Sequence, residues 1–277
     1  MNLILIDADE LNDAGLVRVD GDRARHMTRV LRVALGQDVR LGVIDGPLGR
    51  GHVVAIDDDA VNLQCVFGEV PSASPVDLLL ALPRPKVLRR LWAQFAALGV
   101  GRVMLTNAHR VERDYFDTHL LDPRGYRPLL LEGLQQARDT RVPVVSVHKQ
   151  FRVLVEDHLD ALVGDARRLV ADPAAAASIS QVVHASGEVM PTSDQAVRTP
   201  RDHRVLIAVG PEGGWNGFEL DLLRAHGFSS VSMGPRTLRL DTAAVALLAL
   251  VHDALRSTPA PHQQPHPRQA GDRSAAG

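Results

Sequence analysis

Two stretches near the end of the chain combine glycine-rich turns with charged side chains. The first, AVGPEGGWNGFELDLL (208–223), continues an apolar run that begins at 204 and leads into a helical pattern. Its glycines leave backbone N–H groups without side chains in the way, at the carboxyl end of a strand, where open α/β folds bind ligands. The turn therefore predicts a ligand site, with Trp215 exposed beside it. A plain strand-to-helix turn uses the same residues, so this motif alone leaves both interpretations open.

The second stretch, SSVSMGPRTLRLDTAAVALLALVHDAL (229–255), repeats the order of strand, loop and helix. Its apolar residues recur at helical spacing, and Arg236, Arg239 and Asp241 stand where that helix begins. Loops that follow successive strands are expected to lie side by side at one edge of a sheet. Neither loop is a phosphate-binding P-loop or a GxGxxG dinucleotide fingerprint, which disfavours a nucleotide-dependent oxidoreductase.

Alternating strand and helix patterns lead up to these two stretches. Such alternation predicts a mostly parallel sheet covered on both faces. Residues 172–200 have no sustained period and are expected to form a loosely structured connection. The predicted strands are 76–83, 102–107, 142–147 and 204–210, and the predicted helices are 86–99 and 128–138.

The helix after the first glycine-rich turn has clear end signals. Asn216 and Glu219 form a capping-box pattern, so the helix is expected to begin at Gly217 and to end before Gly227. Its inward-facing side chains are expected to be Phe218, Leu222 and Leu223.

The first seventy residues are typical of a small β-rich domain. Three short β-branched runs separated by turn signals predict a meander that forms part of a barrel. Residues 22–36 predict a helix with Met27, Val30, Leu31 and Ala34 facing inward and a basic stripe on an adjoining face. PSASP (71–75) has the composition of a linker. The predicted organisation is a first domain at 1–70, a second at 71–257 and a disordered tail at 258–277.

Composition indicates the compartment and excludes some kinds of site. Cys65 is the one cysteine of the 277 residues, so we expect no disulfide and no thiolate metal site. The chain shows neither a signal-peptide pattern nor an apolar run long enough to span a membrane. These features predict a cytoplasmic protein with no metal and no membrane partner.

Basic residues are concentrated in the middle of the chain. The net charge is −2, but residues 71–156 hold 13 basic against 8 acidic residues, whereas residues 1–70 hold 7 against 12. Of the 31 basic residues 29 are arginines, which suit phosphate contacts and base stacking, although a GC-rich genome also produces such an excess. Single basic residues usually belong to a solvated face, but as a group they predict RNA contact. The candidates are Arg25, His26, Arg29 and Arg32 in the first domain and Arg84, Lys86, Arg110, Arg113 and Arg138 in the basic middle.

The paired motifs GPEGGWNGFEL and MGPRTLRLDTA resemble the signature of the RsmE-type methyltransferases of the SPOUT superfamily. Further similarity lies in HMTRVLRVALGQDV (26–39), LPRPKVLRRLWAQFAALGV (82–100) and LEGLQQARDTRVP (131–143). The resemblance implies an α/β fold with an N-terminal PUA-like β-barrel and a C-terminal SPOUT domain containing a trefoil knot. It also implies a homodimer that uses S-adenosylmethionine to methylate N3 of a uridine in 16S ribosomal RNA of the small subunit.

The resemblance further implies which residues hold the cofactor. Those of the first loop are Gly210, Pro211, Glu212, Gly213 and Gly214, and those of the second are Met233, Gly234, Leu238, Arg239, Asp241 and Thr242. The chain departs from the family where Ala97 and Gln135 replace Glu, Arg138 replaces Gly, Asp241 replaces Glu and Trp215 replaces Phe.

Methylation of N3 of uracil requires loss of the N3 proton. Arg239 or Arg236 could stabilise the developing anion near O2 or O4. Glu212 or Asp241 could accept the proton, although either carboxylate could instead only stabilise a helix N-terminus. Two alternatives remain open: a SPOUT enzyme with a different rRNA or tRNA target, and a non-catalytic RNA-binding relative.

Overall fold

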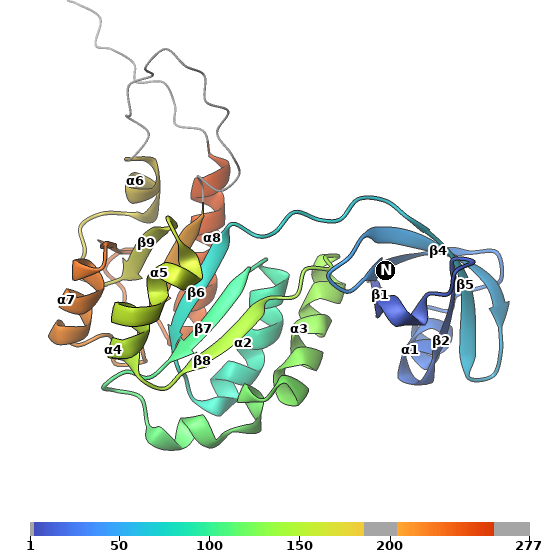
Figure 1. Ribbon diagram of the computed structural model, residues 1–277, viewed down its shortest axis with the longest axis horizontal. Helices are drawn as coiled ribbons and strands as arrows, with labels where there is room; N and C mark the ends of the chain where they lie inside the picture. Colours follow the sequence, from blue (N-terminus) through green and yellow to red (C-terminus); the bar gives the residue numbers. More distant parts are fainter. Residues whose placement is uncertain (1–2, 186–203, 258–277) are drawn as a thin grey trace, which may run out of the picture.

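The computed structural model describes residues 3–185 and 204–257, and within them the chain forms two units at opposite ends of an elongated molecule (Figure 1). Each unit is built on one sheet with its own apolar core. The predicted tail at 258–277 and residues 186–200 of the predicted connection lie outside the described residues.

The small unit is a five-stranded sheet in the order β1-β3-β4-β5-β2. β3, β4 and β5 are antiparallel neighbours, which confirms the predicted meander. β1 and β2 lie at the two edges, so the sheet forms a half-barrel, whereas a PUA-like barrel was predicted. Its strands are β1 (Ile4–Ile6), β2 (Leu16–Asp20), β3 (Asp38–Val43), β4 (Leu48–Ile56) and β5 (Ala60–Phe67).

The helix predicted over 22–36 is shorter and less regular than expected. α1 (Gly21–Arg25) continues as a π-helical turn (His26–Val30), and Arg32 then adopts a left-handed backbone with φ of 51°. Because a π turn advances by five residues instead of four, the inward face shifts. Val30 is consequently 65% exposed, and Ala34, also predicted to face inward, is exposed. The predicted regular helix was therefore wrong, whereas Arg25, Arg29 and Arg32 of the predicted basic stripe are all exposed.

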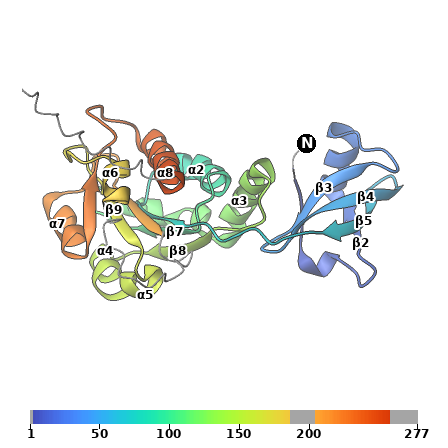
Figure 2. The same cartoon turned by 90° about the horizontal axis from the view of Figure 1, so that it is seen from above.

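The large unit is a six-stranded, fully parallel sheet in the order β11-β9-β10-β6-β7-β8. Helices α2 (Pro85–Ala97), α3 (Pro123–Ala137) and α8 (Leu240–Arg256) cover one face, and α4 (Phe151–Val153) and α5 (Leu159–Val163) cover the other (Figure 2). The parallel sheet was predicted correctly. Its strands are β6 (Val76–Ala81), β7 (Arg102–Thr106), β8 (Val144–His148), β9 (Arg167–Ala171), β10 (Val205–Val209) and β11 (Phe228–Val231).

α2 and α8 bury the faces that their apolar spacing predicts. Leu88, Leu91, Trp92 and Phe95 of α2 are fully buried, and the chain leaves this helix through Gly99 with φ of 72°. The helices of the large unit are α2 (Pro85–Ala97), α3 (Pro123–Ala137), α4 (Phe151–Val153), α5 (Leu159–Val163), α6 (Ile179–His184), α7 (Gly217–Ala225) and α8 (Leu240–Arg256). Short 3₁₀ turns lie at Ala8–Glu10, Arg113–Asp117 and His119–Leu121, and a π turn at Leu154–His158 joins α4 to α5.

Two expectations about this unit were wrong. The stretch predicted to be a loose connection contains α6, which Ser178 and Gln181 cap reciprocally and which packs on α8. In α7, which begins at Gly217 as predicted, Phe218 is 61% exposed, and the buried residues are Glu219 and Leu223. Phe218 lies in the first turn, and the capping contacts turn Glu219 rather than Phe218 toward the interior.

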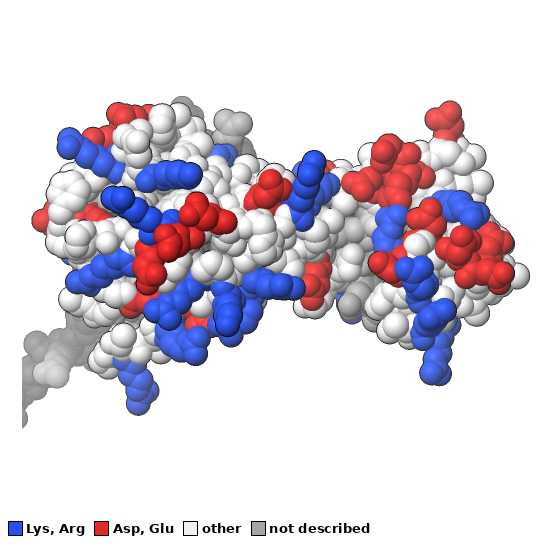
Figure 3. All heavy atoms as spheres, turned by 90° about the horizontal axis from the view of Figure 1, so that it is seen from below, with Lys and Arg blue, Asp and Glu red and all other residues white. Residues whose placement is uncertain are grey.

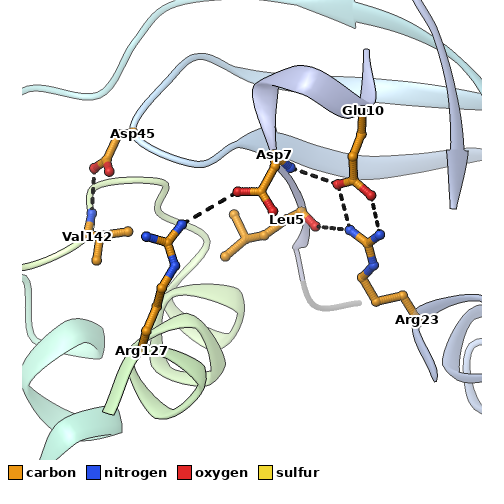
Figure 4. A network of polar contacts seen from close by, with 7 residues as sticks. All are labelled: Leu5, Asp7, Glu10, Arg23, Asp45, Arg127 and Val142. Atoms are coloured by element: carbon orange, nitrogen blue, oxygen red, sulfur yellow. Dashed lines mark hydrogen bonds and ion pairs between the residues drawn. The ribbon is translucent and has the colours of Figure 1, made fainter. Parts of the chain in front are cut away.

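Residues 140–142, which follow α3, hold the large unit against the small unit through hydrogen bonds. The Asp45 N–H donates to Thr140 O at 2.8 Å, and the Thr140 hydroxyl donates to Gly46 O at 2.7 Å. Arg127 of α3 also lies 3.5 Å from Asp7, and the Val142 N–H donates to the Asp45 carboxylate (Figure 4).

Arg138 ends α3 in a left-handed conformation with φ of 61°. This is the helix-ending position that favours glycine, which explains why glycine is usual here in the family that the chain resembles.

In the ranges 3–185 and 204–257, no helix has both the length and the apolar character that crossing a membrane requires.

We predict that Arg204→Met destabilises the large unit. Asp77 is fully buried in β6 and pairs with Arg204, and burial raises the pKa of its carboxyl while Arg204 and Arg102 oppose this. Removing the cation should lower the free energy of unfolding by about 2–3 kcal/mol at neutral pH, less than for a fully buried pair because Arg204 is partly exposed. The loss should shrink as the pH falls through the raised pKa of Asp77, because a protonated carboxyl needs no cation.

Urea unfolding at several pH values measures this effect. The double variant Asp77→Asn, Arg204→Met is the control, and it should regain part of the lost stability at neutral pH. A single Arg204→Met variant as stable as the wild type would contradict the prediction.

Candidate active site

The two glycine-rich loops line one cavity of about 420 Å³ at the carboxyl edge of the large sheet. They follow β10 and β11, which lie on either side of β9 in the sheet. The loops were therefore correctly predicted to lie side by side, although the strand between their parent strands was not foreseen. Apolar side chains form part of the wall, namely Val209, Leu220, Val231, Leu240, Ala243 and Leu247.

The first loop folds back on Trp215. This indole is 7% exposed and packs against Phe151 of α4, with ring centroids 5.2 Å apart. The prediction that Trp215 is exposed was therefore wrong. A Cβ atom at Gly210 would lie 3.0 Å from the indole Cδ1 and 3.1 Å from the Trp215 backbone N. Gly210 is therefore needed for close approach, whereas Gly214 is needed for its φ of 74°.

Glu219 fixes the end of this loop from inside the protein. It is 3% exposed, and its two carboxylate oxygens accept the His109 N–H at 2.6 Å and the Asn216 N–H at 2.8 Å. The Asn216 side chain in turn accepts the Glu219 N–H at 2.8 Å. A buried carboxylate at a helix N-terminus is stabilised by such charge-assisted bonds and by the helix dipole. The capping contact was predicted, but the bond to His109 was not.

The second loop places arginines and a carboxylate at the start of α8. Arg236 lines the cavity, and Leu238 is 38% exposed at its mouth. Asp241 lies 2.8 Å from Arg90 of α2 and 3.5 Å from Arg239, and it also accepts the Thr242 N–H at 3.0 Å. This carboxylate is thus held by several donors in the first turn of the helix.

A second, more polar cavity adjoins the first. It has a volume of about 420 Å³, and the Glu212 carboxylate at its edge lies 3.5 Å from Arg84, which begins α2. The two cavities share Glu212, Thr237, Leu238 and Leu240.

The structure brings most of the residues expected to hold the cofactor to the first cavity. Arg239 and Asp241 instead line the second, and Thr242 is exposed in the first turn of α8. Sequence reasoning placed Trp215 beside the site but did not predict that it lines the cavity, and it missed most of the apolar wall and residues 171–174 at the end of β9. The expected cofactor residues that line it are Gly210, Pro211, Glu212, Gly213, Gly214, Met233, Gly234 and Leu238; Arg236, expected as a catalytic residue, lines it as well.

The residues expected to contact RNA are all exposed, but they fall into separate groups. Arg25, His26, Arg29 and Arg32 lie on the small unit, Arg84 and Lys86 at the start of α2, Arg110 and Arg113 after β7, and Arg138 at the joint between the units. Seen from below, Lys and Arg side chains spread across the large unit with acidic side chains between them (Figure 3). In the same view the small unit carries acidic clusters beside a basic strip.

Among residues 3–185 and 204–257, no group of three or more His, Cys, Asp or Glu side chains is arranged to hold a metal ion.

Comparison with known proteins identifies the family. Residues 70–252 match the model of the RNA methyltransferase domain, and residues 19–64 match that of the RNA methyltransferase PUA domain. The chain belongs to the RNA methyltransferase family. The α/β fold with a PUA-like unit and the resemblance to RsmE-type enzymes are thereby confirmed.

Curated relatives and a solved structure agree with this assignment. This RNA methyltransferase is 28% identical to the ribosomal RNA small subunit methyltransferase E of Treponema pallidum, over 96% of this chain and 98% of that protein. It is 27% identical to the protein of the same name from Mycobacterium bovis, over 91% and 92% of the two chains. The ribosomal RNA small subunit methyltransferase E of Neisseria gonorrhoeae, whose crystal structure contains S-adenosyl methionine, has the same fold. Its TM-score is 0.67 at 18% identity, covering 91% of this chain and 97% of that one.

We predict that Gly210→Ala destabilises this RNA methyltransferase and displaces Trp215. The added methyl group would lie 3.0–3.1 Å from the indole and the Trp215 backbone, closer than ordinary van der Waals contact, so Trp215 must shift and the free energy of unfolding should fall by about 1–3 kcal/mol. Gly217→Ala is the matched control, because a Cβ atom there meets nothing within 4 Å. Because Gly217 is exposed at the first position of α7, alanine there should leave stability unchanged or raise it by up to about 1 kcal/mol.

Chemical denaturation followed by tryptophan fluorescence measures both variants. Equal stability of the two variants would show that the Gly210–Trp215 approach is not as tight as described.

Proposed function

We propose that this chain transfers a methyl group from S-adenosylmethionine to N3 of a uridine in 16S ribosomal RNA, acting on the small subunit in the cytoplasm. The observation that carries the proposal is the cavity between two loops with few side chains, in a chain of the RNA methyltransferase family. The names of the full-length relatives support the ribosomal small subunit as the substrate.

The residues of the first cavity fit S-adenosylmethionine. A volume of about 420 Å³ lies within the range of small-molecule sites, which is roughly 300–1,000 Å³. Its apolar wall suits an adenine ring, and the bare backbone at 210–214 and 233–234 offers hydrogen-bonding groups to the base and ribose. Trp215 lines the same cavity, and within the described part of the chain its buried Nε1–H has no hydrogen-bond acceptor. A ligand or water oxygen could accept this bond.

Positioning is the main catalytic requirement of this reaction. S-adenosylmethionine supplies an electrophilic methyl group, and displacement in line with the sulfur needs the acceptor nitrogen held close to it. The second cavity adjoins the first through Glu212 and Leu238, so we assign it to the target base. The base has to leave its paired state to enter, because N3 lies on the pairing edge.

Of the two candidate bases, Glu212 is the better placed. Its side chain is 47% exposed, borders both cavities and has one ion pair at 3.5 Å, so an oxygen remains available for the N3 proton. Asp241 is instead held by Arg90, Arg239 and the Thr242 N–H, which fits an anion that stabilises the start of α8. Arg236 and Arg239 are the cations available to stabilise charge on the uracil oxygens.

The small unit and the basic residues around the site are proposed to bind the RNA. We assign 1–70 to an RNA-binding domain and 71–257 to the methyltransferase domain. A protein with a net charge of −2 cannot rely on charge alone, so recognition is proposed to depend on the folded shape of the ribosomal subunit. The homodimer and the trefoil knot are likewise proposed, on the resemblance to the SPOUT family. The proposed RNA contacts are Arg25, His26, Arg29, Arg32, Arg84, Lys86, Arg113 and Arg138.

Two experiments test the proposed function. Calorimetry should detect binding of S-adenosylmethionine, and mass spectrometry of 16S rRNA from a deletion strain should show one uridine without its N3-methyl group. The purified protein should restore the modification on small subunits and act poorly on short naked RNA. Unchanged rRNA in the deletion strain would point to another RNA target, and absence of cofactor binding would point to a non-catalytic relative.

A further inference from the structure

The loop after β7, residues 107–117, contacts the first glycine-rich loop and the start of α7. The His109 N–H reaches the buried carboxylate of Glu219 at 2.6 Å. Further along, the Tyr115 hydroxyl and Glu212 both lie beside Arg84 and raise the pKa of its guanidinium. The loop after β7 therefore lies beside the first glycine-rich loop.

Arg110 makes the most direct of these contacts. Its Nη1 donates to the Gly213 carbonyl and lies 3.5 Å from the Gly214 carbonyl. The aliphatic part of the Arg110 side chain also packs closely on Gly213, since a Cβ atom at Gly213 would lie 2.7 Å from Arg110 Cδ. The guanidinium thus covers the corner where the first loop turns back toward Trp215.

The backbone next to Arg110 is fixed independently of any RNA. Because Glu219 is buried and holds the N–H groups of both His109 and Asn216, it joins the base of Arg110 to the end of the loop that Arg110 contacts. The side chain consequently reaches its two carbonyls from a fixed origin, which lowers the entropy lost in forming the contact.

We propose that Arg110 is a positioning residue that holds the Gly213–Gly214 corner in the shape that binds the cofactor. This role replaces the RNA contact expected from its place in the basic segment. The inference rests on the proposed function, because it takes S-adenosylmethionine as the ligand of the loop. A loop with glycines at 210, 213 and 214 has little side-chain packing of its own, so an external donor is needed to restrict it.

The test compares three variants of the full chain. Arg110→Ala removes the donor, and Arg110→Lys keeps one cationic donor on a flexible stem. Arg113→Ala removes an exposed arginine three residues further along the same loop. Calorimetry gives the Kd for S-adenosylmethionine, filter binding gives the Kd for small subunits, and amide exchange without ligand reports on the loop itself.

Arg110→Ala should raise the cofactor Kd roughly tenfold, as expected for loss of a charge-assisted hydrogen bond, and change subunit affinity by less than about twofold. The Gly214 N–H, which donates to Pro211 O at 2.8 Å, should exchange faster in the free protein. Arg110→Lys should restore part of the cofactor affinity. Arg113→Ala should weaken subunit binding and leave the cofactor Kd unchanged.

Two results would overturn the inference while leaving the proposed function intact. One is an Arg110→Ala protein that binds S-adenosylmethionine as the wild type does but loses subunit affinity. The other is unchanged exchange of the Gly214 N–H in that variant. Failure of the wild type itself to bind S-adenosylmethionine would instead reject the proposed function, and the cofactor role of Arg110 with it.

Discussion

The site depends on the buried carboxylate of Glu219. A loop that leaves its backbone bare toward a ligand cannot be stabilised by its own side chains, so its shape has to be imposed from outside. Glu219 restricts the loop from the protein interior by accepting hydrogen bonds from N–H groups at the start of α7 and in the loop after β7. Because an unpaired buried carboxylate is costly, these bonds form together and fix the two segments relative to each other.

The remaining contacts extend the same constraint around the loop. Trp215 anchors one end on Phe151, and the absence of a side chain at Gly210 lets the chain pass close to the indole. The second loop is fixed differently, because Arg90 and Arg239 hold Asp241 at the start of α8. Each loop therefore depends on a carboxylate in the first turn of its following helix, and the cavity lies between the two fixed loops.

Local signals made much of this predictable from the sequence. The capping pair Asn216 and Glu219 lies three residues apart, so the start of α7 was clear, and alternating apolar runs correctly indicated a parallel sheet. β9 was missed because Arg167 and Arg168 interrupt its apolar pattern. The strand tolerates both arginines because their guanidinium groups donate hydrogen bonds to backbone carbonyls of neighbouring segments. Contacts between segments far apart in the sequence could not be predicted from local patterns. The partner of Glu219 is 110 residues away, and burial of Trp215 depends on Phe151, 64 residues earlier.

The most direct measurement is a crystal structure of the protein with S-adenosylmethionine. The account predicts that the adenosine lies in the cavity between 210–214 and 233–238, hydrogen-bonded to loop backbone, with Trp215 still packed on Phe151. A ligand bound elsewhere, or loops that separate so that one of them makes no contact with it, would contradict the account.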